Sequence, residues 1–211
     1  MLQSPHFSCH PAPVTSGLRE RKKAATRRAL HVAALELVAA RGLDAVSVDD
    51  IATAADVSPR TFFNYFPGKD DAVLGLDPDE ADAVARALAA RPVDESPLDA
   101  LRAVAHDQAH DMALETDLWT LRMQVIDASP ALLARLAAAF GRGEQSVAAA
   151  LAARCGAGPH DLYPRLLAGV SGVAVRTALH RWLATDFTAS LPDLVDEAWA
   201  SLAAGLPVPP S

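Results

Sequence analysis

The spacing of apolar residues is the feature that most constrains how this 211-residue chain can fold. Between Arg19 and Arg41 these residues recur every three or four positions, as they do on one face of an α-helix, and Gly42 then provides a stop. No run alternates β-branched or aromatic residues with polar ones, as a half-buried strand would. The chain is therefore predicted to be all-α.

Capping residues, prolines and glycines divide this pattern into roughly nine or ten helices. Ser47 and Ser58 are good N-caps, and Pro67 with Gly68 must end the helix that Ser58 begins. Pro78 is expected to bend or divide the fourth helix and to mark a domain boundary, and residues 91–97 are expected to form a loop. The expected helices cover residues 19–41, 48–55, 59–66, a segment from 69, 79–90, 97–114, 117–128, 130–154, 159–185 and 191–204.

Charge is distributed unevenly along the chain. The net charge is −7, yet residues 1–70 carry +2 and residues 71–211 carry −9. Six basic residues lie between positions 19 and 28 against one acid, Glu20. Because the Debye length is about 8 Å at physiological salt, this cluster acts locally despite the acidic remainder. A basic segment on an acidic protein is consistent with nucleic-acid binding, although many such segments are only solvated helix faces.

The stretch SPRTFFNYF, residues 58–66, concentrates aromatic residues in a chain that has few of them. Two short helices joined by a tight turn, and following a longer helix, predict a helix-turn-helix over residues 47–66. Phe62 and Phe66 lie four positions apart and are expected to enter the core. The residues between and before them then face outward, where Arg60, Thr61 and Asn64 can contact base edges.

The segment LDAVSVDDIATAADVSPRTFFNYFPGKDDAVL resembles the DNA-binding signature of the TetR family of bacterial transcriptional regulators. The resemblance covers about residues 19–79. It implies a tail at 1–18, a DNA-binding domain at 19–78 and a C-terminal helical ligand-binding and dimerisation domain at 79–211. It also implies a homodimer that acts on a palindromic double-stranded operator, most often as a repressor released by a small molecule.

The resemblance further implies a role for individual residues. Ser47 and Ser58 would contact phosphates at two helix N-termini, and Tyr65 and Lys69 would hold the DNA backbone. Four residues would face the major groove: Arg60, Thr61, Phe63 and Asn64. Phe63 stands where many members carry tyrosine, so a hydroxyl contact is absent at that position.

Bulky residues in the middle of the second domain are either core or the wall of an effector cavity, which would suit a largely apolar ligand. The candidate lining residues are Met112, Trp119, Arg122, Met123, Ile126 and Phe140. Apolar stripes in the last two helices predict a dimer interface. Their residues are Leu166, Leu167, Val170, Val173 and Ala174 in the first, and Leu194, Val195, Ala198, Trp199 and Leu202 in the second.

Two alternatives remain open at this level. One is a regulator without a small effector. The other belongs to a different class: His106 and His110 lie one helical turn apart and could bind a metal with His180, giving a metal sensor or a helical metal-dependent hydrolase. No nucleophile motif or phosphate-binding loop accompanies them, so neither an enzyme nor a cofactor is expected. No apolar run reaches the roughly 20 residues of a membrane span, and a cytoplasmic protein is expected.

Overall fold

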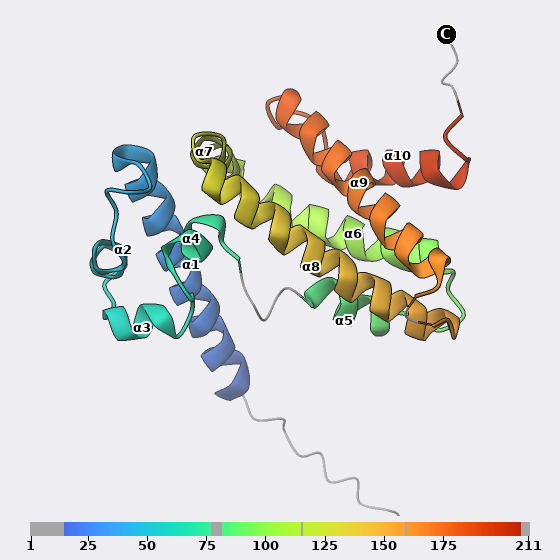
Figure 1. The fold of residues 1–211 in the computed structure, drawn as a ribbon, viewed down its shortest axis with the longest axis horizontal. Helices are drawn as coiled ribbons and strands as arrows, with labels where there is room; N and C mark the ends of the chain where they lie inside the picture. The colour runs from blue at the N-terminus through green and yellow to red at the C-terminus, as the bar shows by residue number, and fades with distance from the viewer. Residues whose placement is uncertain (1–14, 77–81, 115, 159, 208–211) are drawn as a thin grey trace, which may run out of the picture.

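The computed structural model describes residues 15–76, 82–114, 116–158 and 160–207, and within these ranges every regular element is an α-helix. This confirms the all-α prediction. Helices α1–α4 gather at one end of the molecule, and α5–α10 form the bundle beside them (Figure 1). The helices are α1 (Thr15–Arg41), α2 (Val48–Ala54), α3 (Pro59–Phe63), α4 (Lys69–Leu74), α5 (Ala83–Ala89), α6 (Pro97–Ala113), α7 (Thr116–Asp127), α8 (Pro130–Cys155), α9 (Leu162–Ala184) and α10 (Leu191–Ala203).

Several helix ends differ from the sequence prediction; α9, for example, begins at Leu162 and not at 159. Helix α1 begins at Thr15, so it includes the last residues of the expected tail. Helix α3 ends at Phe63 with Asn64 as its C-cap, and Phe66 is reached through a further turn. Helix α4 ends at Leu74 because Gly75 adopts the left-handed conformation, with φ 62°. Pro78, which was expected to bend this helix, lies outside the described residues.

The helix-turn-helix is built as its sequence predicts. Phe62 and Phe66 are fully buried against Ile51 and Ala52 of α2, and Leu37 of α1 packs against the same cluster. Their rings lie 6.0 Å apart between centroids, and Val57 packs beneath the turn. The aromatic pair therefore fixes α3 on α1 and α2 through apolar burial.

This core also includes residues from the middle of the chain. Val125 and Ile126 at the end of α7 and Leu132 at the start of α8 are buried in the same cluster as the helix-turn-helix. Helix α7 makes its main contacts with α1, and α8 continues from it across the bundle (Figure 1). The N-terminal helices are thus joined to the rest of the molecule by a continuous apolar core.

A second core lies among α6, α9 and α10. Trp182 of α9 and Trp199 of α10 are its largest fully buried side chains, and Trp182 contacts Phe187 edge-on at 4.6 Å between ring centroids. Leu194 and Val195 of α10 are buried here too. The apolar stripe of the last helix, which was predicted to contribute to a dimer interface, is consequently used within the chain.

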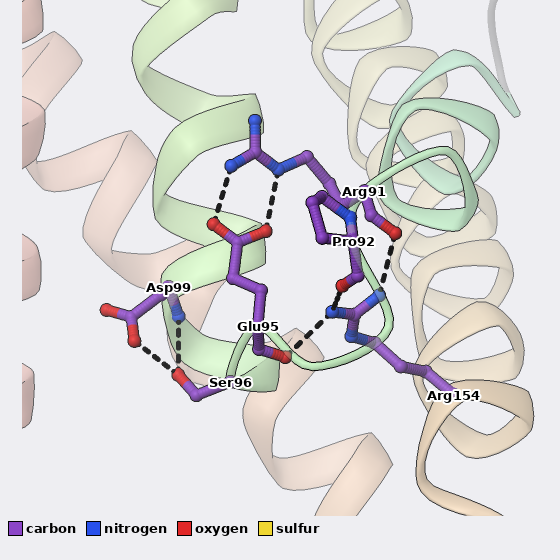
Figure 2. Close-up of polar contacts among 6 residues, drawn as sticks. All are labelled: Arg91, Pro92, Glu95, Ser96, Asp99 and Arg154. Atoms are coloured by element: carbon purple, nitrogen blue, oxygen red, sulfur yellow. Dashed lines mark hydrogen bonds and ion pairs between the residues drawn. The ribbon is translucent and has the colours of Figure 1, made fainter.

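The loop between α5 and α6 is held by α8. Arg154 donates hydrogen bonds to the main-chain carbonyls of Arg91, Pro92 and Glu95 (Figure 2). The Arg91 guanidinium donates two hydrogen bonds to the Glu95 carboxylate, and this pairing lowers the pKa of Glu95. The loop expected at 91–97 is therefore present and ordered by two arginines.

No single described helix is long and apolar enough to cross a membrane, although one bent pair, 118–127 with 130–155, meets the length and composition criteria together.

Candidate DNA-binding surface and ligand cavity

Helix α3 presents the predicted reading residues on the surface. Arg60 and Asn64 are exposed, Thr61 is half-buried, and Phe63 is 58% exposed although it is a large apolar residue. The Phe63 ring stands edge-on to buried Phe62, at 5.4 Å between centroids. The buried Phe62 ring thus fixes the exposed Phe63 ring. The four predicted residues lie together on α3 and its C-cap, Asn64.

The Ser58 hydroxyl caps α3. It accepts a hydrogen bond from the Thr61 main-chain N–H at 3.1 Å and forms a second hydrogen bond with the Thr61 hydroxyl at 2.8 Å. If the Thr61 hydroxyl donates in this pair, Ser58 keeps its own proton for a further acceptor.

Ser47 has a different environment. Its hydroxyl and its main-chain N–H both donate to the Asp50 carboxylate, and the Asp50 N–H donates back to the hydroxyl, which completes a capping box on α2. Hydrogen bonding from Ser47 holds the pKa of Asp50 below its ordinary value. Ser47 thus has a capping role, and its predicted phosphate contact stays a prediction.

Lys69, predicted to contact the DNA backbone, also supports the protein backbone. Its ammonium donates to the carbonyls of Leu43 at 2.7 Å and Val46 at 2.9 Å, in the loop that leads into α2. A lysine ammonium has three N–H donors, so one remains. Tyr65 lies half-buried against the helix-turn-helix core.

The basic segment of α1 lies next to this surface. Arg19, Arg21 and Lys22 are exposed, and the guanidinium carbon of Arg27 lies 4.7 Å from the centroid of the Phe66 ring. The positive charge predicted from the sequence is therefore carried on the helix that packs beside the end of the helix-turn-helix.

A cavity of about 620 Å³ lies between the N-terminal helices and the bundle. Its wall is largely apolar and is formed by α5, α6, α8, α9 and α10 together with α4 and the residues that flank it. The charged residues of the lining are Asp71, Arg135, Arg142, Glu144 and Arg176. Its volume falls in the range of small-molecule sites, which is about 300–1,000 Å³.

The six residues predicted to line an effector cavity do not come together. Phe140 of α8 lines the cavity and is 50% exposed. Ile126 is buried in the helix-turn-helix core, and Met112 and Trp119 pack against the second core. The Arg122 guanidinium lies 4.9 Å from the centroid of the Trp119 ring, and desolvation lowers the pKa of Arg122 to about 10. Met123, next to Arg122 on α7, does not line this cavity.

An ion pair joins α4 to α8 at the cavity wall. The Arg135 guanidinium donates to both carboxylate oxygens of Asp71, at 2.9 Å and 2.6 Å, and this pairing raises the pKa of Arg135. The Asp71 side chain is 11% exposed, whereas that of Arg135 is 44% exposed. Sequence reasoning missed this pair, although the seven-residue spacing of Arg135 and Arg142 places both arginines on one face of α8.

One of the predicted metal ligands, His106, lies beside a carboxylate of α10. The His106 Nδ1 atom lies 3.2 Å from a carboxylate oxygen of Asp196, which also accepts a hydrogen bond from Arg102. Among the residues that the structure describes, no group of three His, Cys, Asp or Glu side chains is placed to hold a metal ion.

Two family descriptions match the chain. Residues 30–74 match the bacterial regulatory proteins of the tetR family, and residues 95–207 match the MftR C-terminal domain. The HTH-type transcriptional regulator TcmR of Streptomyces glaucescens is 34% identical over 183 residues, which cover 83% of this chain and 80% of TcmR. The putative mycofactocin biosynthesis transcriptional regulator MftR of Mycobacterium tuberculosis is 32% identical over 190 residues, covering 88% of this chain and 93% of MftR.

A solved structure has the same architecture. Thermus thermophilus FadR, a TetR-family repressor crystallised with lauroyl-CoA, superposes with a TM-score of 0.52 and 25% identity, covering 88% of this chain and 97% of FadR. With one matched segment on the helix-turn-helix and the other on the helical bundle, the chain belongs to the TetR family of DNA-binding transcriptional regulators.

Proposed function

We propose that this protein is a cytoplasmic homodimeric repressor that binds a palindromic operator and leaves it when a small molecule enters the cavity. The observation that carries the DNA-binding part is the α3 surface, where Arg60 and Asn64 are exposed on a helix fixed by buried Phe62. Arginine pairs with guanine and asparagine with adenine in the major groove. The exposed Phe63 ring offers an apolar contact to a thymine methyl group.

Residues around the α3 surface would position α3 on the DNA by contacting its phosphate backbone. We assign phosphate contacts to the Ser58 hydroxyl, the Tyr65 hydroxyl and the third N–H of the Lys69 ammonium. The basic first half of α1 adds long-range attraction. Phosphate contacts fix the register of the protein on the DNA and carry no sequence information. Contacts of Arg60, Thr61 and Asn64 with bases would provide the sequence specificity.

Release by a small molecule is supported by the cavity and by its position. The cavity is lined both by α4, which follows the helix-turn-helix, and by five helices of the bundle, α5, α6, α8, α9 and α10. A ligand there would touch both parts of the protein at once. That Thermus thermophilus FadR is a repressor solved with lauroyl-CoA supports a ligand-controlled repressor on this fold.

Dimerisation would use the exposed face of α9. Leu162, Leu166 and Val173 are 76%, 56% and 52% exposed, and their spacing of four and seven residues places them on one side of the helix. Exposed apolar residues in such a row are typical of a subunit interface.

Selection of bound sequences from random duplexes, followed by fluorescence anisotropy on the selected operator, tests the DNA-binding proposal. Arg60→Ala and Asn64→Ala are each expected to cost ~1–3 kcal/mol of operator affinity and to relax base preference at particular positions. Arg181→Ala, an exposed arginine on α9, serves as the control and is expected to bind normally. Recovery of no preferred sequence by the wild-type protein would refute the proposal.

A further inference from the structure

The charges in the cavity wall are unbalanced toward positive. Three arginines and two acids line it, and one arginine is paired with Asp71. Within the described ranges, neither Arg142 nor Arg176 forms an ion pair, and both are exposed. A guanidinium at a partly enclosed, largely apolar wall is a good partner for a carboxylate or phosphate, which it can bind through two parallel hydrogen bonds.

Arg135 and Arg142 of α8 both line the cavity. Seven residues separate Arg135 from Arg142, which is two helical turns or about 10.5 Å along the axis, so both lie on the cavity side of the helix. Gly143 also lines this side, and a Cβ atom at that position would meet nothing within 4 Å. The wall next to Arg142 is therefore not filled by other side chains at this point.

Arg135 has capacity for a second anion. Arg135 donates to the Asp71 carboxylate through Nε and one terminal nitrogen, which leaves further N–H donors of the guanidinium unassigned. The Asp71 side chain is 11% exposed and that of Arg135 is 44% exposed, so a ligand in the cavity meets the arginine more readily than the aspartate. An anion on those donors would lie close to the Asp71 carboxylate, and repulsion between the two like charges would weaken the Arg135–Asp71 pair. A buried carboxylate that loses its partner is strongly destabilised.

Asp71 connects this exchange to the DNA-binding helices. It lies on α4 between Lys69, which holds the loop before α2, and Ala72, whose carbonyl accepts a hydrogen bond from His31 of α1 at 2.7 Å. A shift of α4 that returns the Asp71 carboxylate to water would disturb both contacts. The position of α2 and α3 would change with them.

We propose that the cavity takes a largely apolar ligand with one acidic group, which binds Arg142 and Arg135 and competes with Asp71 for Arg135. This inference rests on the proposed function, since it names the ligand class of the same cavity. Linkage makes the competition reciprocal: if the acid weakens the Asp71–Arg135 pair, removal of the Asp71 charge must strengthen binding of the acid.

The test uses three probes with the same chain: dodecanoate, dodecyl phosphate and 1-dodecanol. Calorimetric titration of the full-length protein is expected to give at least one acid about tenfold tighter binding than the alcohol. Arg142→Gln should remove most of that advantage, and Asp71→Asn should raise affinity for the acid about threefold or more without changing affinity for the alcohol. Arg181→Gln, outside the cavity lining, is the control and should change nothing. Comparison of the two acids separates a carboxylate ligand from a phosphate one.

Several outcomes would overturn the inference. They are failure of both acids to bind, equal binding of acids and alcohol, or an acid advantage that persists in Arg142→Gln and fails to grow in Asp71→Asn. A merely structural role for Asp71 would not tighten acid binding. Circular dichroism on each variant establishes that it is folded, and Asp71→Glu provides a second, charge-retaining variant. Operator binding on the same samples separates the two proposals: release by the alcohol as well as by the acids would leave ligand control standing and refute the acidic class.

Discussion

At the scale of single residues, the side chains around the helix-turn-helix serve the fold and the proposed DNA contact together. Lys69 is the clearest case, because two of its three donors go to the carbonyls of Leu43 and Val46 and only one is left for phosphate. The sequence signature placed a cation at this position. It did not indicate the loop carbonyls, because the loop conformation depends on how α1, α2 and α4 pack.

Lys69→Met should therefore lower stability as well as DNA affinity. The substitution removes two charged hydrogen bonds to main-chain carbonyls, and the Leu43 carbonyl keeps only a long hydrogen bond from the Val46 N–H, at 3.5 Å. We therefore expect a loss of ~1–3 kcal/mol in the free energy of unfolding by urea. Lys22→Met, an exposed residue of the basic segment, should leave the unfolding free energy nearly unchanged. A Lys69→Met protein as stable as the wild type would mean that the two hydrogen bonds contribute nothing.

Ser47 and Asp50 give a prediction about pH. The pKa of Asp50 is depressed below 3.8 chiefly by hydrogen bonds from Ser47, so this carboxylate stabilises the fold above that value and loses its contribution as pH falls through the lower, folded pKa. Ser47→Ala should raise the pKa of Asp50 toward 3.8, as measured by an NMR titration of its carboxyl carbon. Ser96→Ala, which removes the same kind of cap from α6, should leave the Asp50 pKa where it is.

At the scale of elements, most helices follow from local signals. The expected 97–114 and 130–154 agree with α6 and α8 to within one residue at each end, because a proline in the first turn marks both starts, and Ser96 also caps α6. Helix α4 instead ends at its C-cap, Gly75, three residues before the proline that was expected to bend or divide it. A glycine inside a helical pattern gives no local sign of its backbone conformation.

Gly75→Ala tests that stop. An alanine would meet both an unfavourable φ of 62° and the His31 ring, whose Cε1 atom would lie 3.0 Å from the new Cβ. We expect a loss of ~1–2 kcal/mol from the backbone alone, and more because His31 must also give way. Gly42→Ala is the matched control, because Gly42 has φ 82° but open space around its Cβ position. Equal losses for the two variants in thermal unfolding would show that the His31 contact is unimportant.

At the scale of the whole molecule, the division between the DNA-binding helices and the bundle is less complete than the sequence suggested. Val125, Ile126 and Leu132 lie far along the chain but share a core with Phe62 and Phe66. Periodicity identifies such residues as buried without saying which partner buries them. The same limit explains the predicted effector residues, which were apolar and central in the sequence but were mostly used for packing.

The cavity illustrates what local patterns omit. Its wall combines arginines of α8 and α9 with an aspartate of α4 that is 64 positions from Arg135. Each of these residues alone resembles a solvated charge on a helix face. Only the packing of the helices brings them to one enclosed wall, so their combined chemistry becomes visible in the folded chain.

The exposed side of α9 leads to a prediction about assembly. Stripes in the last two helices suggested an interface, but the apolar residues of α10 are buried within the chain, so the exposed residues of α9 are left for a partner. Leu166→Arg with Val173→Arg should leave the protomer folded, because both side chains are more than half exposed, and should convert a dimer into a monomer in sedimentation velocity. Operator affinity should fall about a hundredfold or more, since two half-sites would no longer be bound by one particle.

The control for this assembly test is an exposed apolar residue that lies away from α9, in the loop between α5 and α6. Val93 is 88% exposed in the loop that Arg154 holds, so Val93→Arg adds one positive charge away from α9 and should leave both sedimentation and operator affinity unchanged. Dimers that persist in the doubly substituted protein would place the interface on another face. Loss of dimers in Val93→Arg would point to a general effect of added positive charge. The proposal is supported if only the α9 variant is monomeric, with reduced operator binding and an unaltered helical signal in circular dichroism. Helix α9 would then be the element that sets the spacing of the two helix-turn-helix units in the dimer.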